Sequence, residues 1–256
     1  MLIKKSTAHA HHVNSSVALA SHNDGQKKTG RMLSEIILGG QDGLVNTLGV
    51  ILGIAAASSD FRVVVAGGLA GAMAEAVSMG AVGYTSKVAE KDYYLSELQR
   101  EEDEIENIPH EEVQEIRDIY EKKGFRGDLL EEVVRVVTSD KKVWLHTMMQ
   151  EELNLSPVDD GQPVKSALLI GFSSFVGALV PLVPFALFYF LDGPASRQMP
   201  LAVTIAMLIA AIVLFVVGAV KSKLTIGVWY KSGFSMLVIG VISAMVGYVV
   251  GLAFRA

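Results

Sequence analysis

Residues 166–190 read SALLIGFSSFVGALVPLVPFALFYF and contain no acidic or basic side chain. A helix of about 20 apolar residues crosses the roughly 30 Å hydrocarbon core of a bilayer, because each residue adds about 1.5 Å. Residues 200–220 and 232–253 have the same character. The whole chain has 256 residues, of which 51% are hydrophobic and 19% are charged. These stretches predict a protein built on membrane-spanning helices.

Two earlier stretches, residues 33–58 and 63–87, are apolar enough to insert but carry polar side chains. Asp42 lies in the first, and Glu75 lies in the second with Met79 one turn later on the same helix face. Ionisable side chains are costly in lipid, so each is a functional candidate by default. A site made of these carboxylates and the Met79 thioether would bind Fe(II) or Mn(II) when the carboxylates are deprotonated and release the ion when they are protonated.

Glycines four residues apart recur in the same two stretches. The pairs are Gly39 and Gly43, Gly49 and Gly53, and Gly67 and Gly71. Small residues at this spacing let helix backbones approach closely. We therefore expect these two helices at a packed interface, within one subunit or between two.

Basic residues flank the five predicted spans unevenly. One side carries Lys27, Lys28, Arg31, Lys87, Lys165, Lys221, Lys223 and Lys231, and the other carries Arg62, Arg197 and Arg255. Cytoplasmic loops hold an excess of Lys and Arg. The N-terminus and the segment between the second and third spans are therefore expected in the cytoplasm.

That segment, residues 90–160, holds 21 of the 27 acidic residues but only 9 of the 22 basic ones. Its apolar residues recur with helical spacing, which predicts a small helical domain instead of a linker. Pro109 fits a helix start and Gly124 a helix end. Asp128 and Asp140 are expected to cap two further helices.

The acidic segment places metal-binding side chains in pairs on single helix faces. The pairs are Glu101 with Glu104, Glu112 with Glu115, and Met148 with Glu152. Like charges on one face repel, whereas a divalent cation stabilises them, and oxygen ligands with a thioether suit Mn(II) or Fe(II). The alternative is a solvated acidic surface, with Met148 in the core.

Several other functions are disfavoured. A di-iron oxidase uses Glu-x-x-His on two helices, but His110 and His146 have Asn107 and Val143 three residues earlier. The chain has no Cys and therefore no thiolate metal site. It also has no phosphate-binding Gly-x-x-x-x-Gly-Lys-Ser/Thr motif, so a proton gradient is the available driving force for transport. The acidic segment would repel nucleic acid. We expect neither an enzyme nor a prosthetic group.

Residues 39–46, GGQDGLVN, and residues 75–80, EAVSMG, together with the glutamate-rich segment, resemble the vacuolar iron transporter family, which has prokaryotic members. The resemblance runs from about Leu33 to Phe254. It implies a homodimer of five-helix subunits that moves Fe(II) or Mn(II) out of the cytosol against protons, with the pathway between subunits. Many members carry an acid where this chain has Tyr84.

The resemblance also assigns site residues. It implies a membrane site at Asp42 and Met79 and a cytoplasmic site at Glu101, Glu104, Glu112, Glu115, Met148 and Glu152. Glu75 is a candidate on its own position, and not through the resemblance. A membrane-anchored metal buffer or sensor is the alternative function.

We therefore expect an all-α integral membrane protein with five transmembrane helices and a cytoplasmic helical metal-binding domain inserted between helices 2 and 3. The expected parts are a disordered polar tail over 1–30, two transmembrane helices over 31–89, the acidic domain over 90–160 and three transmembrane helices over 161–256. The protein would lie in the cell membrane of a prokaryote or the vacuolar membrane of a eukaryote.

Overall fold

The computed structural model describes residues 3–192, 198–224 and 227–255, with side chains from residue 29 onward except those of residues 192 and 224. Every regular element in these ranges is a helix. In chain order they are α1 (Ile3–Ala57), α2 (Phe61–Asn107), α3 (Pro109–Lys122), α4 (Gly127–Thr138), α5 (Lys141–Thr147), the π-helix η1 (Met148–Glu152), α6 (Gln162–Asp192), α7 (Met199–Leu224) and α8 (Trp229–Ala253).

Five of these helices are long and apolar enough to cross a bilayer, as the sequence predicted. The candidate spans are Thr29–Ala57, Phe61–Asn107, Gln162–Leu191, Met199–Lys223 and Trp229–Ala253. α2 has 47 residues, about 70 Å of helix, so only part of it fits within a bilayer.

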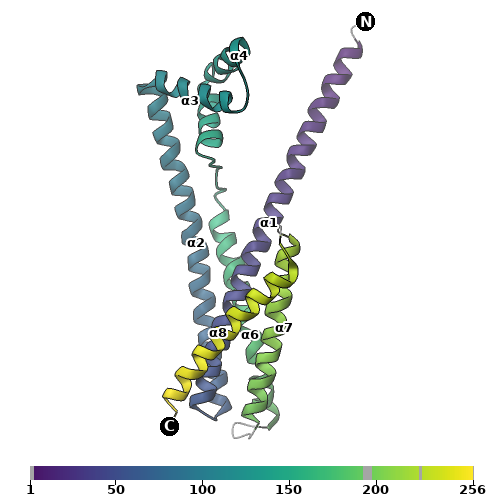
Figure 1. Cartoon of the computed structure of the whole chain (residues 1–256), viewed down its shortest axis with the longest axis vertical. Helices are drawn as coiled ribbons and strands as arrows, with labels where there is room; N and C mark the ends of the chain where they lie inside the picture. Colours follow the sequence, from purple (N-terminus) through teal and green to yellow (C-terminus); the bar gives the residue numbers. More distant parts are fainter. Residues whose placement is uncertain (1–2, 193–197, 225–226, 256) are drawn as a thin grey trace. The chain divides into compact units, whose positions relative to one another are not determined.

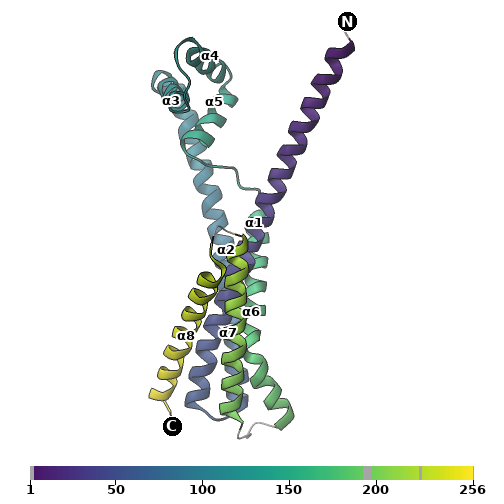
Figure 2. The same ribbon diagram turned by 45° about the vertical axis from the view of Figure 1, so that its right-hand side comes forward.

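The chain divides into two compact units. Residues 84–164, which we call the insert, form one unit, and residues up to 83 together with those from 165 onward form the other, which we call the bundle. The bundle contains α1, the first half of α2, α6, α7 and α8 (Figures 1 and 2). The insert boundaries are wider at both ends than the charge pattern of residues 90–160 suggested.

The first helix differs from its predicted extent. α1 begins at Ile3, so residues 3–30 are helical where a disordered tail was expected. Residues 3–24 contain neither Gly nor Pro, so no residue among them breaks a helix. Their polar composition gave no sign of the helix.

Close contact between backbones holds α1 against two neighbours. A Cβ atom at Gly43 would lie 2.0 Å from the carbonyl oxygen of Ser174 on α6. On the other side of α1, a Cβ at Gly53 would lie 2.9 Å from the carbonyl oxygen of Gly247 on α8. Only glycine fits at such distances, so the expectation of tight helix packing is confirmed for the two glycine pairs of α1, whereas Gly67 and Gly71 of α2 meet only side chains.

Two apolar clusters fill the rest of the bundle. One joins Leu44 and Leu48 of α1 to Leu214 of α7 and its neighbours on α8. The other surrounds Phe61 at the start of α2 and Phe185 of α6. These apolar contacts thus fix the rotation of α1 and α2, and with it the direction in which their polar residues face.

The insert has an apolar core of its own. Its buried residues are Ile105, Ile116, Leu130, Val134, Val137, Trp144 and Met148. They belong to the apolar residues that recur at helical spacing in this segment of the sequence. This core holds the end of α2 against the short helices, and it positions the glutamates on the same helices.

Three of the four helix starts and ends predicted in the insert are confirmed. α3 begins at Pro109, Gly124 follows its end with a φ of +101°, and the carboxylate of Asp140 accepts from the N–H of Lys142 at 2.8 Å. The cap at Asp128 is wrong, because α4 begins at Gly127 after an extended Arg126. Gly127 has a φ of +59°, a left-handed conformation that glycine adopts readily at the point where the extended chain turns into α4.

Candidate metal sites

The bundle brings the acids of the first two spans together. The amide of Asn46 on α1 donates to the Oε1 of Glu75 on α2 at 3.0 Å. The carboxyl of Asp42 interacts with both Asn46 and Glu75. We call these three residues the membrane cluster. Its two carboxyls and one amide oxygen are hard ligands suited to a divalent cation.

The membrane cluster lies on a face of the bundle that the rest of the chain leaves partly open. Asn46 is exposed, and Asp42 and Glu75 are half-buried. Around them Val50 is 45% and Val77 70% exposed. Polar groups that face hydrocarbon are costly even when they are paired with one another, so covering this face would stabilise the protein.

Met79 and Glu35 lie outside the membrane cluster. Met79 is half-buried one turn after Glu75 on α2, as the sequence placed it. Glu35 of α1 instead accepts a hydrogen bond at 2.7 Å from the hydroxyl of Ser166 on α6, a side chain that is 1% exposed. Its carboxyl therefore joins α1 to α6.

The insert brings five glutamates close enough to influence one another's ionisation. These are Glu101, Glu104, Glu112, Glu115 and Glu152, which we call the glutamate cluster. Glu101 and Glu112 are buried, with 1% and 2% of their surface exposed. One carboxyl oxygen of each is buried without a hydrogen-bond partner. A buried polar atom without a partner destabilises a fold unless something else binds it.

Burial and mutual repulsion change the acidity of this cluster. Burial, followed by the charges of Glu115 and Glu101, raises the pKa of Glu112 to about 7. Partial desolvation of its carboxyl group, followed by the charges of Glu115 and Glu101, also raises the pKa of Glu152 to about 7. Burial raises the pKa of Glu101, although the Arg100 guanidinium opposes this effect. Protons therefore compete with cations for these carboxyls near neutral pH.

Arg100 is the cation that the fold itself supplies to the cluster. Its guanidinium donates to Glu101 Oε1 at 2.7 Å and to Glu104 Oε2 at 2.8 Å. It also donates to Glu97 Oε2 at 3.0 Å. Its side chain is 46% exposed, so it reaches the cluster from the solvent side. The guanidinium thus lies where a metal ion would interact with the same two carboxylates.

The last two candidates lie on one turn of π-helix. The N–H of Leu153 donates to the carbonyl of Met148 at 3.2 Å, five residues back. Met148 is fully buried in the apolar core of the insert, which was the alternative role considered for it. Glu152 is exposed and shares a hydrogen bond with Glu115. Single π-turns are frequent at functional sites.

The carboxylates do not form a closed metal-binding shell. Among the residues that the structure describes, no three Asp, Glu or His side chains are placed to hold a metal ion. The arrangement is an anionic cluster in which Arg100 and protons balance the charge. Binding an ion would require the Arg100 guanidinium to leave and the carboxyls to converge.

Comparison with known protein families matches residues 33–252 of this chain to the VIT family. The chain belongs to the VIT family. With five candidate membrane-spanning helices it is a multi-pass integral membrane protein of that family.

Named relatives of this VIT family member align over almost the whole chain. Vacuolar iron transporter 2 of Oryza sativa subsp. japonica is 33% identical over 230 residues, covering 90% of each chain. Vacuolar iron transporter 1 of Arabidopsis thaliana is 29% identical over 230 residues, covering 90% of this chain and 89% of the other. The vacuolar iron transporter of Plasmodium berghei is 30% identical over 255 residues, covering 98% and 91%.

Arg100 was not among the site residues predicted from the sequence. Its spacing was a usable signal, because Glu97 and Glu104 lie three residues before and four residues after it on one helix. The pairing of Asn46 with Glu75 had no such signal, since it joins two helices whose rotation the sequence does not specify.

Proposed function

We propose that this VIT family member moves Fe(II) or Mn(II) out of the cytosol in exchange for protons. The observation that carries the proposal is the membrane cluster, in which Asp42 and Glu75 interact within the membrane-spanning bundle. Carboxylates bind a divalent ion when deprotonated and release it when protonated, which couples the two species. The relatives named vacuolar iron transporters support iron as the cargo.

The glutamate cluster would collect the ion from the cytoplasm before transport. Its oxygen ligands suit both metals, and the Met148 thioether could complete the set once the core loosens around it. The unpartnered buried oxygens of Glu101 and Glu112 support this role, because an arriving cation would stabilise them. Neither step requires an enzymatic reaction or a prosthetic group.

The active form would be a homodimer. A second copy placed against the open face of α1 and α2 would cover the exposed Asn46 and bring two membrane clusters together. Two-fold symmetry makes one such face sufficient, because each subunit covers the same surface of the other. Met79 would then lie beside the shared pathway, where its thioether favours Fe(II) over harder ions.

The N-terminus and the insert would face the cytoplasm. The excess of Lys and Arg near the corresponding helix ends supports this orientation. The membrane would be the vacuolar membrane in a eukaryote, as the names of the relatives suggest, and the cell membrane in a prokaryote.

A membrane-anchored metal buffer or sensor is the second candidate. The observation in its favour is that the insert is a compact unit with its own core and its own carboxylates. This function needs the glutamate cluster, but it does not need Asp42 or Glu75.

The test is metal flux into proteoliposomes across an imposed pH gradient, with a pH-sensitive dye in the lumen. We expect Fe(II) and Mn(II) uptake with opposite proton movement, lost in Asp42→Asn and retained in the control Asp60→Asn. Asp60 lies in the turn between α1 and α2, where it pairs with Arg62. Metal binding without flux in correctly inserted wild-type protein would favour the buffer. Flux that survives Asp42→Asn would remove Asp42 from the pathway.

A further inference from the structure

A groove separates α7 from α8 at one end of the bundle. The two helices touch where a Cβ at Gly218 would lie 2.8 Å from the Gly233 Cα. From there they diverge toward the C-terminal end of α8 (Figures 1 and 2). The opening between them has a volume of about 580 Å³, and α1 forms its floor.

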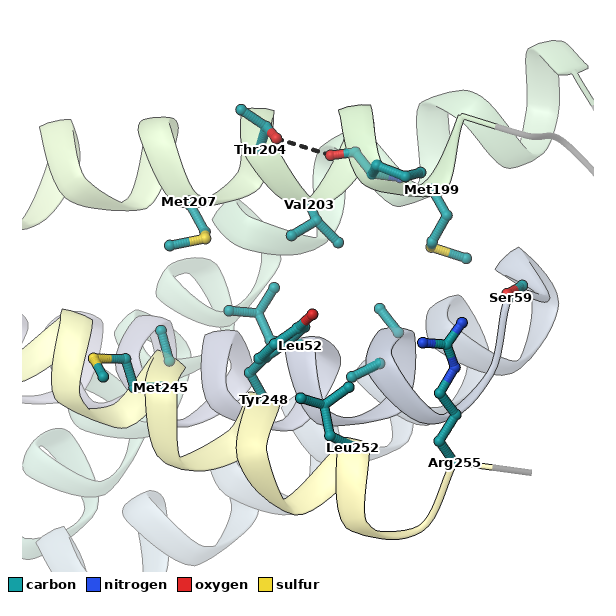
Figure 3. A pocket seen from close by; sticks show the side chains of 14 residues that line it. Leu52, Ser59, Met199, Val203, Thr204, Met207, Met245, Tyr248, Leu252 and Arg255 are labelled. Carbon is teal, nitrogen blue, oxygen red and sulfur yellow. Dashed lines mark hydrogen bonds between the residues drawn. The ribbon is translucent and has the colours of Figure 1, made fainter.

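The walls of the groove are apolar. Figure 3 shows Met199, Val203 and Met207 of α7 facing Met245, Tyr248 and Leu252 of α8, with Leu52 of α1 between them. Of the three hydroxyls in the lining, that of Thr204 already donates to the Pro200 carbonyl at 2.8 Å, which leaves those of Tyr248 and Ser59. Water would therefore find few partners here, and the groove favours hydrocarbon.

The dimensions match one leaflet of a bilayer. From Met199 to Met207 the α7 wall rises about 12 Å, and from Met245 to the end of α8 at Ala253 the α8 wall also rises about 12 Å, with Arg255 beyond it. Half of the hydrocarbon core is about 15 Å. A single acyl chain of one leaflet would run the length of this groove.

A positive charge lies at the end of the groove where a headgroup would be. The Arg255 guanidinium extends over that end toward Ser59 (Figure 3). Arg255 is exposed, and none of the carboxylates in the described part of the chain forms an ion pair with it. Arginine binds phosphate through planar paired hydrogen bonds.

We infer that the groove binds one acyl chain of an anionic phospholipid, with the lipid phosphate at Arg255. This site depends only on the bundle lying in a membrane, and it is independent of the ion transported. A second copy of the chain is a poorer occupant, because the polar face that needs covering is on α1 and α2 around Asn46.

The test is native mass spectrometry of the full-length protein with dioleoyl phosphatidylglycerol and dioleoyl phosphatidylcholine. Removing one arginine near the headgroup should weaken phosphatidylglycerol binding about fivefold in Arg255→Gln and leave phosphatidylcholine binding unchanged. The matched control is Arg62→Gln, an exposed arginine at the same end of the bundle that already pairs with Asp60 at 3.3 Å.

A second variant blocks the chain instead of the headgroup. Met207 faces the groove (Figure 3), so Met207→Trp fills it and should abolish the stoichiometric binding of both lipids, while Leu208→Trp, at an exposed position of α7 outside the groove lining, should not. Equal weakening by Arg62→Gln and Arg255→Gln would overturn the proposal, as would unchanged binding in both Arg255→Gln and Met207→Trp. Loss of the dimer in Met207→Trp alone would assign the groove to a second copy. If Met207→Trp does not fold, the two arginine variants still decide.

Discussion

Metal binding by the insert should fall steeply between pH 7.5 and pH 5.5. Ions bind deprotonated carboxylates, so protonation weakens binding. With a pKa of about 7, the deprotonated fraction of Glu112 drops from about 0.75 to about 0.03 over this range, which weakens affinity about 25-fold. Glu152 has the same pKa, but its side chain is exposed. The two glutamates together should therefore weaken metal affinity by between about 25-fold and several hundred-fold. An ordinary glutamate stays ionised throughout.

The assay is calorimetric titration of Mn(II) into full-length protein that carries Asp42→Asn, so that the membrane cluster does not contribute. Repeating it in buffers of different ionisation enthalpy counts the protons released. Glu112→Gln should remove the roughly 25-fold part of the pH dependence that Glu112 contributes, whereas Glu131→Gln, an exposed carboxylate paired with Arg117, should preserve it. A change in affinity of less than threefold over the two pH units would refute the reasoning.

Three further changes test other parts of the structure. Arg100→Gln should tighten Mn(II) binding at pH 8 by about threefold to tenfold in the same titration, because an exposed competing cation is removed; weaker binding would contradict this. Gly43→Ala should lower stability by about 1–3 kcal/mol, measured by thermal unfolding, since its Cβ would lie 2.0 Å from the Ser174 carbonyl oxygen, and Gly30→Ala, with open space around it, is the control. Asp140→Ala should cost about 1 kcal/mol by removing the α5 cap, and unchanged unfolding would argue against the cap.

The metal-free insert should show the opposite pH effect on its own stability. The raised pKa of Glu112 means that the folded protein holds a proton that the unfolded chain releases between about pH 4.5 and pH 7. The free energy of unfolding should therefore decrease as the pH rises through this range. Thermal unfolding in the presence of a chelator measures it, and a rising midpoint would contradict the assignment.

The membrane spans could be predicted because lipid imposes a simple rule on sequence. A run such as residues 166–190 has no other stable environment. Helix ends were harder to predict, because both Gly127 and Asp128 are acceptable near the start of a helix. The structure places the start of α4 at Gly127, whose φ is positive. The helical residues 3–30 show the same limit, because polarity does not distinguish a solvated helix from a coil.

The candidate sites were predictable only as far as single helices. The spacing of Glu101 and Glu104 places them on one face of α2, and the structure adds which other helices bring carboxyls to that face. The partnership of Asn46 with Glu75 depends on how α1 rotates against α2, a property of packing in three dimensions. The burial of Met148 likewise follows from the core of the insert and not from its spacing to Glu152.

The glycine contacts of α1 have a mechanical consequence. Where Gly43 meets Ser174, and Gly53 meets Gly247, smooth backbone surfaces touch without interlocking side chains. Interlocked ridges and grooves fix the register of two helices, so at these two points the axial position of α1 depends on other contacts. The hydroxyl of Ser243 on α8 donates to the Val45 carbonyl of α1 at 3.1 Å, and the hydroxyl of Ser166 on α6 donates to Glu35. The helix that carries Asp42 is therefore held close to its neighbours by backbone contact, and it is held against sliding along its own axis by side-chain hydrogen bonds.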